Sequence, residues 1–221
     1  PGLGKTIQAI GLINFSELKS GIIVCPATLK LNWLKEMLKW LADKSLTVGV
    51  AYGGEIPDTD FVIINYDILD RNKETLWGEQ WDILICDEAQ YLSNGESKRT
   101  QVIFGTYKMD WATKKVRRKP ERIKQRHNGR VEKVSCLRAN KRLMLTGTPM
   151  MKQPKDMWTI VRDFDPLDLG ASWDDYAFTY CDAVMTSFGL QATGGSNLSE
   201  LNEKLRRAFM IRRLKKNVLK D

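Results

Sequence analysis

The sequence predicts an α/β domain built on a doubly wound parallel sheet. Short apolar runs alternate along the chain with segments of helical periodicity, which is typical of strands joined by crossover helices. The apolar runs are continuous, as expected for parallel strands that are covered on both faces. The chain has 221 residues, of which 43% are hydrophobic, so it is long enough to bury a sizeable core.

Five strands and five helices are expected from these patterns. The strands are expected at residues 22–25, 47–52, 61–65, 83–86 and 142–145. Helices are expected at 6–18 and 29–41, and leucines recur every three or four residues in the second. After Pro154 only helices are expected, at 157–164, 173–181 and 198–209. Asn197 and Glu200 would form a capping box at the start of the last helix.

The positive charge of the chain is concentrated in one segment. Residues 108–133 contain 11 basic and 3 acidic side chains, and this excess equals the net charge of +8 of the whole chain. An anionic partner, most commonly nucleic acid, is one interpretation, and a solvated surface insertion is the other. In the first case phosphates would be bound by Arg117, Arg118, Lys119, Arg122, Lys124 and Arg126, and the affinity would fall with salt.

Several classes of protein are disfavoured by composition. The four cysteines form no CxxC pair and His127 is the only histidine, so we expect neither a structural zinc site nor a multi-histidine metal site. No apolar run is long enough for a membrane span, and no secretory signal is visible. We therefore expect an intracellular protein without membrane association, in the nucleus of a eukaryote or in the cytoplasm of a bacterium or phage host.

The first residues have the pattern of a phosphate-binding loop. In Gly2-Leu3-Gly4-Lys5-Thr6, the glycines would let backbone N–H groups surround phosphate oxygens at the start of a helix. Lys5 would reach the terminal phosphates of ATP, and the Thr6 hydroxyl would bind Mg²⁺. Taken alone, the segment is also compatible with an ordinary helix start that contains glycine.

An acidic pair follows the apolar run at 83–86. Asp87 would hold Mg²⁺, and Glu88 would orient and deprotonate the attacking water. Each carboxylate alone could be an ordinary acid at the end of a strand. A Gly-Lys-Thr helix start together with a strand that ends in Asp-Glu predicts a P-loop NTPase that uses ATP and Mg²⁺.

Four segments together resemble a known family. They are Gly2-Leu-Gly-Lys-Thr6, Ile23-Val-Cys-Pro26 with Asn32-Trp33, the DEAQ box Asp87-Glu-Ala-Gln90, and Leu145-Thr-Gly-Thr-Pro149. The chain resembles the first RecA-like lobe of SWI/SNF-like (sucrose-non-fermenting) DNA translocases in helicase superfamily 2. Arg212-Arg-Leu-Lys215 looks like the closing signature of that lobe, and Tyr180-Cys-Asp-Ala183 with Gly195-Ser-Asn-Leu198 is closest to the annealing-helicase subgroup.

The resemblance implies an organisation of the chain. Residues 1–150 would form the RecA-like ATP-binding lobe, with a basic insertion at 108–133 and with its first strand missing by truncation. Residues 151–221 would form a helical extension that closes the lobe. A second RecA-like lobe, expected in cis, would be absent from this fragment.

The resemblance also implies roles for particular residues. Gln90 and the Thr146-Gly147-Thr148 turn would couple hydrolysis to movement, although this turn could also be a simple tight turn after a buried strand. Contacts to the DNA backbone would come from Pro26, Thr28 and Lys30, with Asn65 and Tyr66 as further contacts. For Pro26, Thr28 and Lys30 a helix start with a solvated lysine is an equally ordinary interpretation.

The function that the resemblance implies is ATP-dependent translocation on double-stranded or branched DNA, serving remodelling or annealing. The arginines that complete the site belong to the second lobe of such enzymes, so the fragment alone is expected to hydrolyse ATP very slowly. Two alternatives remain: a basic nucleic-acid-binding module with an inactive nucleotide site, and an RNA-acting helicase of superfamily 2.

Overall fold

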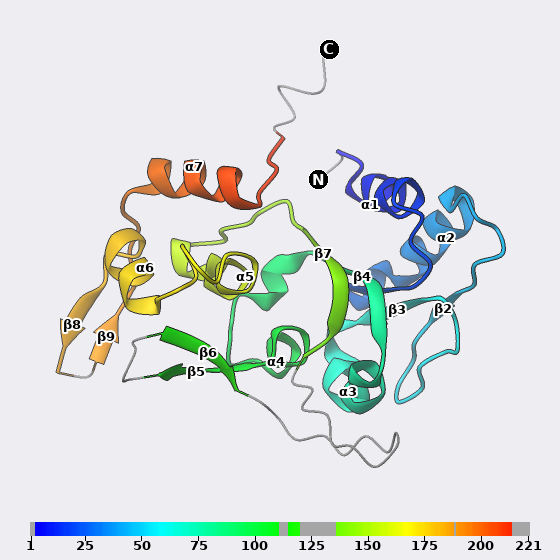
Figure 1. The fold of residues 1–221 in the computed structure, drawn as a ribbon, viewed down its shortest axis with the longest axis horizontal. Coiled ribbons are helices and arrows are strands. Elements are labelled where there is room, and N and C mark those ends of the chain that lie inside the picture. The colour runs from blue at the N-terminus through cyan, green and yellow to red at the C-terminus, as the bar shows by residue number, and fades with distance from the viewer. Residues whose placement is uncertain (1–2, 111–114, 120–135, 188, 214–221) are drawn as a thin grey trace. The chain divides into compact units, whose positions relative to one another are not determined.

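The computed structural model describes residues 3–110, 115–119, 136–187 and 189–213, with the backbone alone for 106–110 and 115–119 (Figure 1). The chain divides into two compact units. The first comprises Pro1–Tyr107 and Arg118–Gly147, and the second comprises Lys108–Arg117 and Thr148–Asp221. None of the helices in the described ranges is long and apolar enough to cross a membrane.

The first unit is built on a five-stranded sheet in the order β2-β3-β1-β4-β7 (Figure 1). Its strands are β1 (Gly21–Cys25), β2 (Val48–Val50), β3 (Phe61–Asn65), β4 (Gln80–Asp87) and β7 (Arg138–Leu145), and all pairs are parallel. Every residue of β1 and β3 is buried, as expected for parallel strands covered on both faces. The predicted five-stranded parallel sheet is therefore confirmed.

Helices cover both faces of this sheet. They are α1 (Lys5–Phe15), α2 (Lys30–Trp40), α3 (Leu69–Gly78) and α4 (Lys98–Phe104). The chain moves towards the β2 edge through α2, and towards the β7 edge through α3 and α4. Because parallel crossovers are right-handed, helices that lead in opposite directions lie on opposite faces, as Figure 1 shows.

Alternate strand residues divide between the two faces. Ile23, Ile63 and Ile85 belong to one core cluster with buried residues of α1 and α2. On the other face α3 and α4 are joined by a hydrogen bond from Trp77 Nε1 to the carbonyl oxygen of Val102, at 2.9 Å. The sequence patterns predicted α1 and α2 but missed α3 and α4, which are short and carry many polar residues.

The second unit has a core of its own. It contains α5 (Trp158–Phe164), α6 (Trp173–Tyr180) and α7 (Leu198–Ala208), preceded by the short helix η4 (Pro154–Met157). Buried residues from all of these elements form one cluster: Met157, Val161, Tyr176, Tyr180, Leu201 and Leu205. The three helices confirm the predicted ones to within two residues at each end.

The expectation that strands end before Pro154 is wrong. An antiparallel hairpin pairs β8 (Val184–Thr186) with β9 (Gly189–Gln191). Each strand has only three residues, too few to show a period, and the turn depends on Gly189, whose φ of 105° strongly favours glycine. A second pair, β5 (Thr106–Asp110) and β6 (Lys115–Lys119), also lies outside the strands that we predicted.

The predicted capping box at α7 is also wrong. Asn197 makes no side-chain cap; its Nδ2 donates to the carbonyl oxygen of Thr179 at 2.9 Å. Glu200 instead accepts a hydrogen bond from Tyr180 and pairs with Lys204 at 2.9 Å. Tertiary partners within the second unit have taken both side chains that the local pattern assigned to the helix end.

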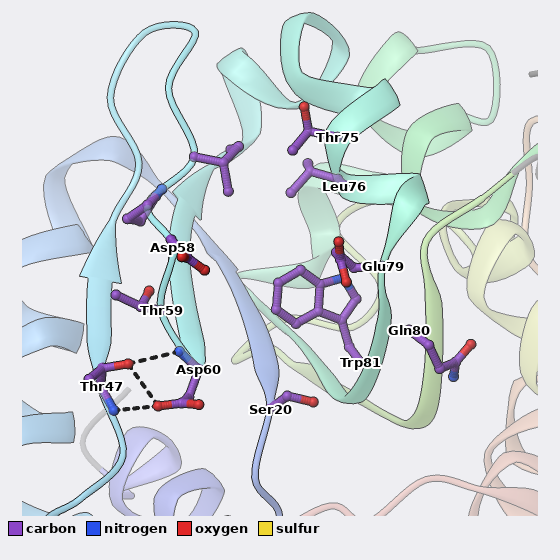
Figure 2. A pocket seen from close by; sticks show the side chains of 12 residues that line it. Ser20, Thr47, Asp58, Thr59, Asp60, Thr75, Leu76, Glu79, Gln80 and Trp81 are labelled. Carbon is purple, nitrogen blue, oxygen red and sulfur yellow. Dashed lines mark hydrogen bonds between the residues drawn. The ribbon is translucent and has the colours of Figure 1, made fainter. Parts of the chain in front are cut away.

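A cavity of about 510 Å³ lies at the amino edge of the sheet in the first unit. Figure 2 shows Ser20, Thr47, Asp60 and Gln80 around it, residues that precede or begin the parallel strands. Asp60 accepts hydrogen bonds from the backbone N–H and the hydroxyl of Thr47, both at 2.7 Å. These bonds favour the ionised form and lower the pKa of Asp60 below its ordinary value.

Asp60→Asn is expected to destabilise the protein by about 1 kcal/mol at pH 7, because a neutral amide oxygen accepts more weakly than a carboxylate. A carboxylate whose pKa is lowered by folding contributes stability above its unfolded pKa of about 4, and this is lost as pH falls through the folded value. The difference in unfolding free energy between variant and parent should therefore become smaller in acid. Thermal unfolding at a series of pH values measures it, with exposed Asp58→Asn as the control. A pH-independent difference would contradict the assignment.

Candidate functional site

The candidate site lies at the carboxyl edge of the parallel sheet. β4 ends at Asp87, which is paired in register with Leu145, the last residue of β7. Thr146 therefore follows directly beside Glu88. On the other side of the sheet centre, β1 and β3 end in register at Cys25 and Asn65. The strand topology brings the acidic pair and the Thr146 turn together, as parallel strands end at one edge.

Asp87 is a buried carboxylate whose two oxygens both accept hydrogen bonds. Oδ2 accepts from Trp33 Nε1 on α2 at 2.9 Å, and Oδ1 accepts from the backbone N–H of Glu88 at 2.9 Å. Only 5% of Asp87 is exposed. A carboxylate has about four lone-pair sites, so these two bonds fix its orientation and leave acceptor capacity for a cation.

The charge of Asp87 is felt by its neighbours. Burial, followed by the negative charge of Asp87, raises the pKa of the Cys25 thiol to about 12. Burial is also the main reason that the pKa of Tyr66 lies above its ordinary value. Both groups are therefore neutral near pH 7, and Cys25 lies in the core strand where the sequence predicted it.

Glu88 starts a chain of side-chain hydrogen bonds. Gln90 Nε2 donates to Glu88 Oε2 at 2.7 Å, and Thr146 Oγ1 donates to Gln90 Oε1 at 2.6 Å. Glu88 has a left-handed backbone, with φ 51° and ψ 52°, a conformation that costs a non-glycine residue about 1 kcal/mol or more. The strained turn aims a half-buried carboxylate at a side chain that also contacts the end of β7.

The start of α1 has the features of an anion site. Its N-cap is Gly4, with a φ of 70°, and no side chain caps the helix or places an acid in the first turn. A Cβ added at Gly4 would meet no atom of the described residues within 4 Å. Lys5 and Thr6 form the first turn, and the Lys5 amine pairs with no acid in the described part of the chain. Gly2 lies outside the described residues.

The direction of α1 brings its amino end to the same edge as Asp87. Asn14, near the end of α1, bonds to the carbonyl oxygen of Trp40 and to the N–H of Ala42, where α2 ends. α2 starts just after the carboxyl end of β1 and therefore ends near the amino edge of the sheet. An 11-residue helix spans about 16 Å, similar to the length of a five-residue strand. Because α1 ends near the amino edge of the sheet, it runs along the strands and starts at the carboxyl edge.

These residues fit a magnesium nucleotide. An uncapped helix start with an unpaired lysine favours phosphate, and a buried carboxylate with remaining lone pairs favours a cation such as Mg²⁺. Lys5 and the α1 amides would hold phosphates, while Thr6 and Asp87 would hold the metal.

The five residues expected to contact DNA are not equally accessible. Thr28 is exposed in a short 3₁₀ turn and Pro26 is half-buried. Lys30 is buried, and its amine donates to the carbonyl oxygen of Ala51 at 2.9 Å. Asn65 is also buried and donates to Asp67, at 3.2 Å. Tyr66 is 2% exposed and its hydroxyl donates to the carbonyl oxygen of Asp87 at 2.7 Å, so burial keeps its side chain from the DNA contact expected of it.

The remaining predicted residues are exposed, have only their backbone described, or lie outside the described residues. Gly147 and Thr148 are exposed after β7. Arg117, Arg118 and Lys119 belong to β6, where only the backbone is described. Outside the described residues lie Arg122, Lys124, Arg126 and the last two residues of the Arg212-Arg-Leu-Lys215 signature.

Sequence reasoning missed the polar role of one residue at this site. The spacing of Trp33, Met37 and Trp40 in the predicted helix at 29–41 indicates packing. Trp33 and Met37 are fully buried, whereas 44% of Trp40 is exposed. The bond from Trp33 to Asp87 could not be anticipated, because it requires β1 and β4 to be neighbours although 54 residues separate the two side chains.

Comparison with known families matches residues 1–110 and 119–221 to the SNF2-related domain. The chain belongs to the SNF2-related domain family. The SNF2-related domain is the ATPase core of its family, so family membership implies the use of ATP.

The curated relatives of this SNF2-related domain include a DNA annealing helicase and a chromatin regulator. The chain is 28% identical over 232 residues to the DNA annealing helicase and endonuclease ZRANB3 of Mus musculus, covering 99% of the chain and 19% of the relative. It is 26% identical to the SWI/SNF-related matrix-associated actin-dependent regulator of chromatin subfamily A-like protein 1 of Xenopus tropicalis, covering 99% of the chain and 20% of the relative. The chain thus spans about a fifth of each.

A solved structure shares the fold. The SWI2/SNF2 ATPase core of Sulfolobus solfataricus, solved in complex with dsDNA, matches 97% of this chain and 38% of its own with a TM-score of 0.64 and 22% identity. The five-stranded parallel sheet therefore has the RecA-like fold that this ATPase core also has.

The bond between Trp33 and Asp87 is expected to stabilise the SNF2-related domain by about 1 to 3 kcal/mol, as hydrogen bonds to charged groups do. A double-mutant cycle with Trp33→Phe and Asp87→Ala isolates it, because Trp33→Phe removes the donor, Asp87→Ala removes the acceptor, and the cavity left by the smaller ring is common to both backgrounds. Unfolding in urea measures the coupling energy. Trp40→Phe is the matched control, since Trp40 Nε1 bonds to Glu36 at an exposed site. Equal coupling energies for both tryptophans would contradict the assignment.

Proposed function

We propose that this SNF2-related domain is the ATP-binding lobe of an ATP-dependent translocase that acts on double-stranded or branched DNA. The observation that carries the proposal is the chain of hydrogen bonds from Glu88 through Gln90 to Thr146, next to the buried Asp87. It joins an acidic pair to the end of a neighbouring strand, at the edge where α1 begins. The relatives named as annealing helicases support the DNA-directed part of the proposal.

Each residue has a distinct task at the nucleotide. Lys5 and the first amides of α1 would bind the phosphates, and Thr6 and Asp87 would hold the metal. Trp33 fixes the orientation of Asp87 through its hydrogen bond to Oδ2. Bound Mg²⁺ neutralises the charge that develops on the phosphates. Glu88 orients the attacking water and accepts its proton, for which its half-buried carboxylate is suited.

Gln90 is the link between chemistry and movement. Its amide donates to Glu88 and its oxygen accepts from Thr146, so a proton gained by Glu88 alters both bonds. The turn that follows Thr146 is exposed and contains Gly147, which gives it freedom to rearrange. Loss of the terminal phosphate would thereby reach the segment that leads into the second unit.

The DNA is held through its backbone and without reading of bases. Thr28, exposed at the start of α2, is the best placed of the predicted contacts, whereas the amine of Lys30 is occupied by Ala51. The basic residues at 108–133 supply further phosphate contacts. The proposal includes three further parts of the translocase. Residues 151–221 would be the closing extension of the lobe, a first strand would precede the phosphate loop, and a second RecA-like lobe would follow in cis.

The nucleotide site is tested by two variants with opposite expectations. Lys5→Ala should weaken binding of fluorescent ATP at least tenfold, because it removes the cation at the phosphates. Glu88→Gln should keep binding within about twofold and abolish hydrolysis measured in a single turnover. Exposed Lys35→Ala and Glu96→Gln are the matched controls and should behave as the parent. If Lys5→Ala binds ATP as tightly as Lys35→Ala, Lys5 does not hold the phosphates and the proposed site is wrong. If the parent chain itself binds no ATP, the domain is a nucleic-acid-binding module with an inactive nucleotide site.

The chain by itself should hydrolyse ATP slowly even with DNA present. An arginine supplied from a partner lobe contributes about 10³ to 10⁵ in rate, and this chain would lack it. Phosphate release with saturating duplex DNA should therefore lie about a thousandfold or more below that of a two-lobed relative assayed alongside. Turnover equal to that of the relative would show that the second lobe is dispensable. Equal stimulation by RNA would favour an RNA-acting helicase.

A further inference from the structure

Tyr66 connects the acidic pair at the end of β4 with an exposed aromatic side chain on the surface. It follows the last residue of β3 and is buried, with 2% of its surface exposed. Its hydroxyl donates a hydrogen bond of 2.7 Å to the backbone carbonyl oxygen of Asp87. One end of the side chain is therefore fixed to the residue that begins the acidic pair.

The ring of Tyr66 is stacked on the ring of Tyr91. The ring centroids are 5.3 Å apart and the planes differ by 7°, close to parallel. Tyr91 is 47% exposed, so the second ring of the stack reaches the surface. Stacked aromatic pairs contribute about 0.5 to 1.5 kcal/mol beyond burial of their area, so the two rings tend to move together.

An arginine completes this surface. The Arg99 guanidinium carbon lies 5.6 Å from the centroid of the Tyr91 ring. Arg99 forms no ion pair with the described residues, whereas its neighbour Lys98 pairs with Asp70 at 3.2 Å. An exposed aromatic ring beside an unpaired guanidinium is a combination suited to the sugar-phosphate backbone of a nucleic acid.

Tyr91 is tied to the acidic pair a second time through the main chain. Its backbone N–H donates to the carbonyl oxygen of Glu88 at 3.0 Å. Glu88 is the residue in the left-handed conformation, and its side chain bonds to Gln90. A displacement of Tyr91 thus reaches both the backbone of Glu88 and, through Tyr66, the carbonyl group of Asp87.

We propose that Tyr66 is a positioning residue, which transmits contact of a DNA backbone with Tyr91 and Arg99 to the backbone of Asp87 and Glu88. The proposal rests on the proposed function, since it assigns a DNA contact and a linkage to the same nucleotide site. Tyr66 itself contacts neither DNA nor nucleotide. DNA that presses on Tyr91 shifts the stacked pair, and the strained turn at Glu88 responds because its geometry is held by these bonds.

Linkage between the two ligands tests the proposal without any need for turnover. If DNA and nucleotide favour the same arrangement of this segment, each raises the affinity of the other by the same factor. The dissociation constant of a short fluorescent duplex is measured with and without adenylyl imidodiphosphate and Mg²⁺. The parent chain is expected to show a ratio of about fivefold or more between the two constants.

Two variants interrupt the connection at different points. Tyr66→Phe keeps the stacking on Tyr91 and removes the hydrogen bond to the Asp87 carbonyl oxygen. Tyr91→Leu removes the stacking and leaves the Tyr66 hydroxyl in place. Both should bring the ratio to within twofold of one. Tyr66→Phe should keep each separate affinity within twofold of the parent value, and Tyr91→Phe should retain the parental ratio because its ring still stacks. A purely structural role for Tyr66 would instead lower thermal stability without changing the ratio.

The surface itself is tested by a neighbouring pair of cations. Arg99→Ala should weaken duplex binding and reduce the slope of affinity against salt by about one, as loss of a single phosphate contact does. Lys98→Ala, next to it on the same helix, should have a smaller effect because Lys98 is paired with Asp70. Equal effects of the two variants would show diffuse attraction and overturn the assignment of this surface.

The remaining outcomes separate this inference from the proposed function. A parental ratio of one, or an unchanged ratio in both Tyr66→Phe and Tyr91→Leu, overturns the inference while nucleotide binding through Lys5 still stands. If the parent chain binds no nucleotide, or binds it independently of Lys5, the proposed function fails first and the inference fails with it.

Discussion

The geometry of the proposed nucleotide site depends on the buried carboxylate of Asp87. A charge removed from water is costly unless hydrogen bonds replace the lost solvation, and here the donors come from α2 and from the next backbone amide. The Trp33 indole can reach Asp87 only when α2 is packed on the sheet and β1 and β4 are adjacent. The core and the site therefore form together, because the carboxylate is tolerable only in the assembled sheet.

A second constraint is the strain at Glu88. A left-handed glutamate persists because its surroundings determine it more strongly than its own preference, through Asp87 before it, and through Gln90 and Tyr91 after it. A residue held in this way is suited to a step in which hydrogen bonds are exchanged. The left-handed backbone of Glu88 cannot continue a strand, which explains why the acidic pair ends β4 instead of lying within it.

The strands were predictable because burial on both faces leaves a plain signal. Phe61–Asn65 is apolar up to its last residue and was placed without error, while β4 and β7 begin earlier than predicted because Gln80 and Arg138 pair at polar strand ends. α3 was missed because its apolar residues, Leu69, Leu76 and Trp77, are separated by a run of polar and charged ones that hides the helical period. The acidic pair and the phosphate-loop pattern were visible for a different reason: their residue types are rarely combined for any other purpose.

Contacts that depend on the direction of a side chain were less predictable. Lys30 matched a DNA-contacting pattern in residue type, yet its amine is turned towards the Ala51 carbonyl and lies 4.1 Å from the Tyr52 ring centroid. Residue type fixes what a lysine can bind, but the loop after β2 decides where this one points, and that loop is far from Lys30 in the sequence. The strand ends that carry the proposed nucleotide site are specified by burial, which a sequence records, whereas the proposed DNA contacts depend on side-chain directions, which it does not. Surfaces such as that of Tyr91 and Arg99 therefore have to be read from the structure.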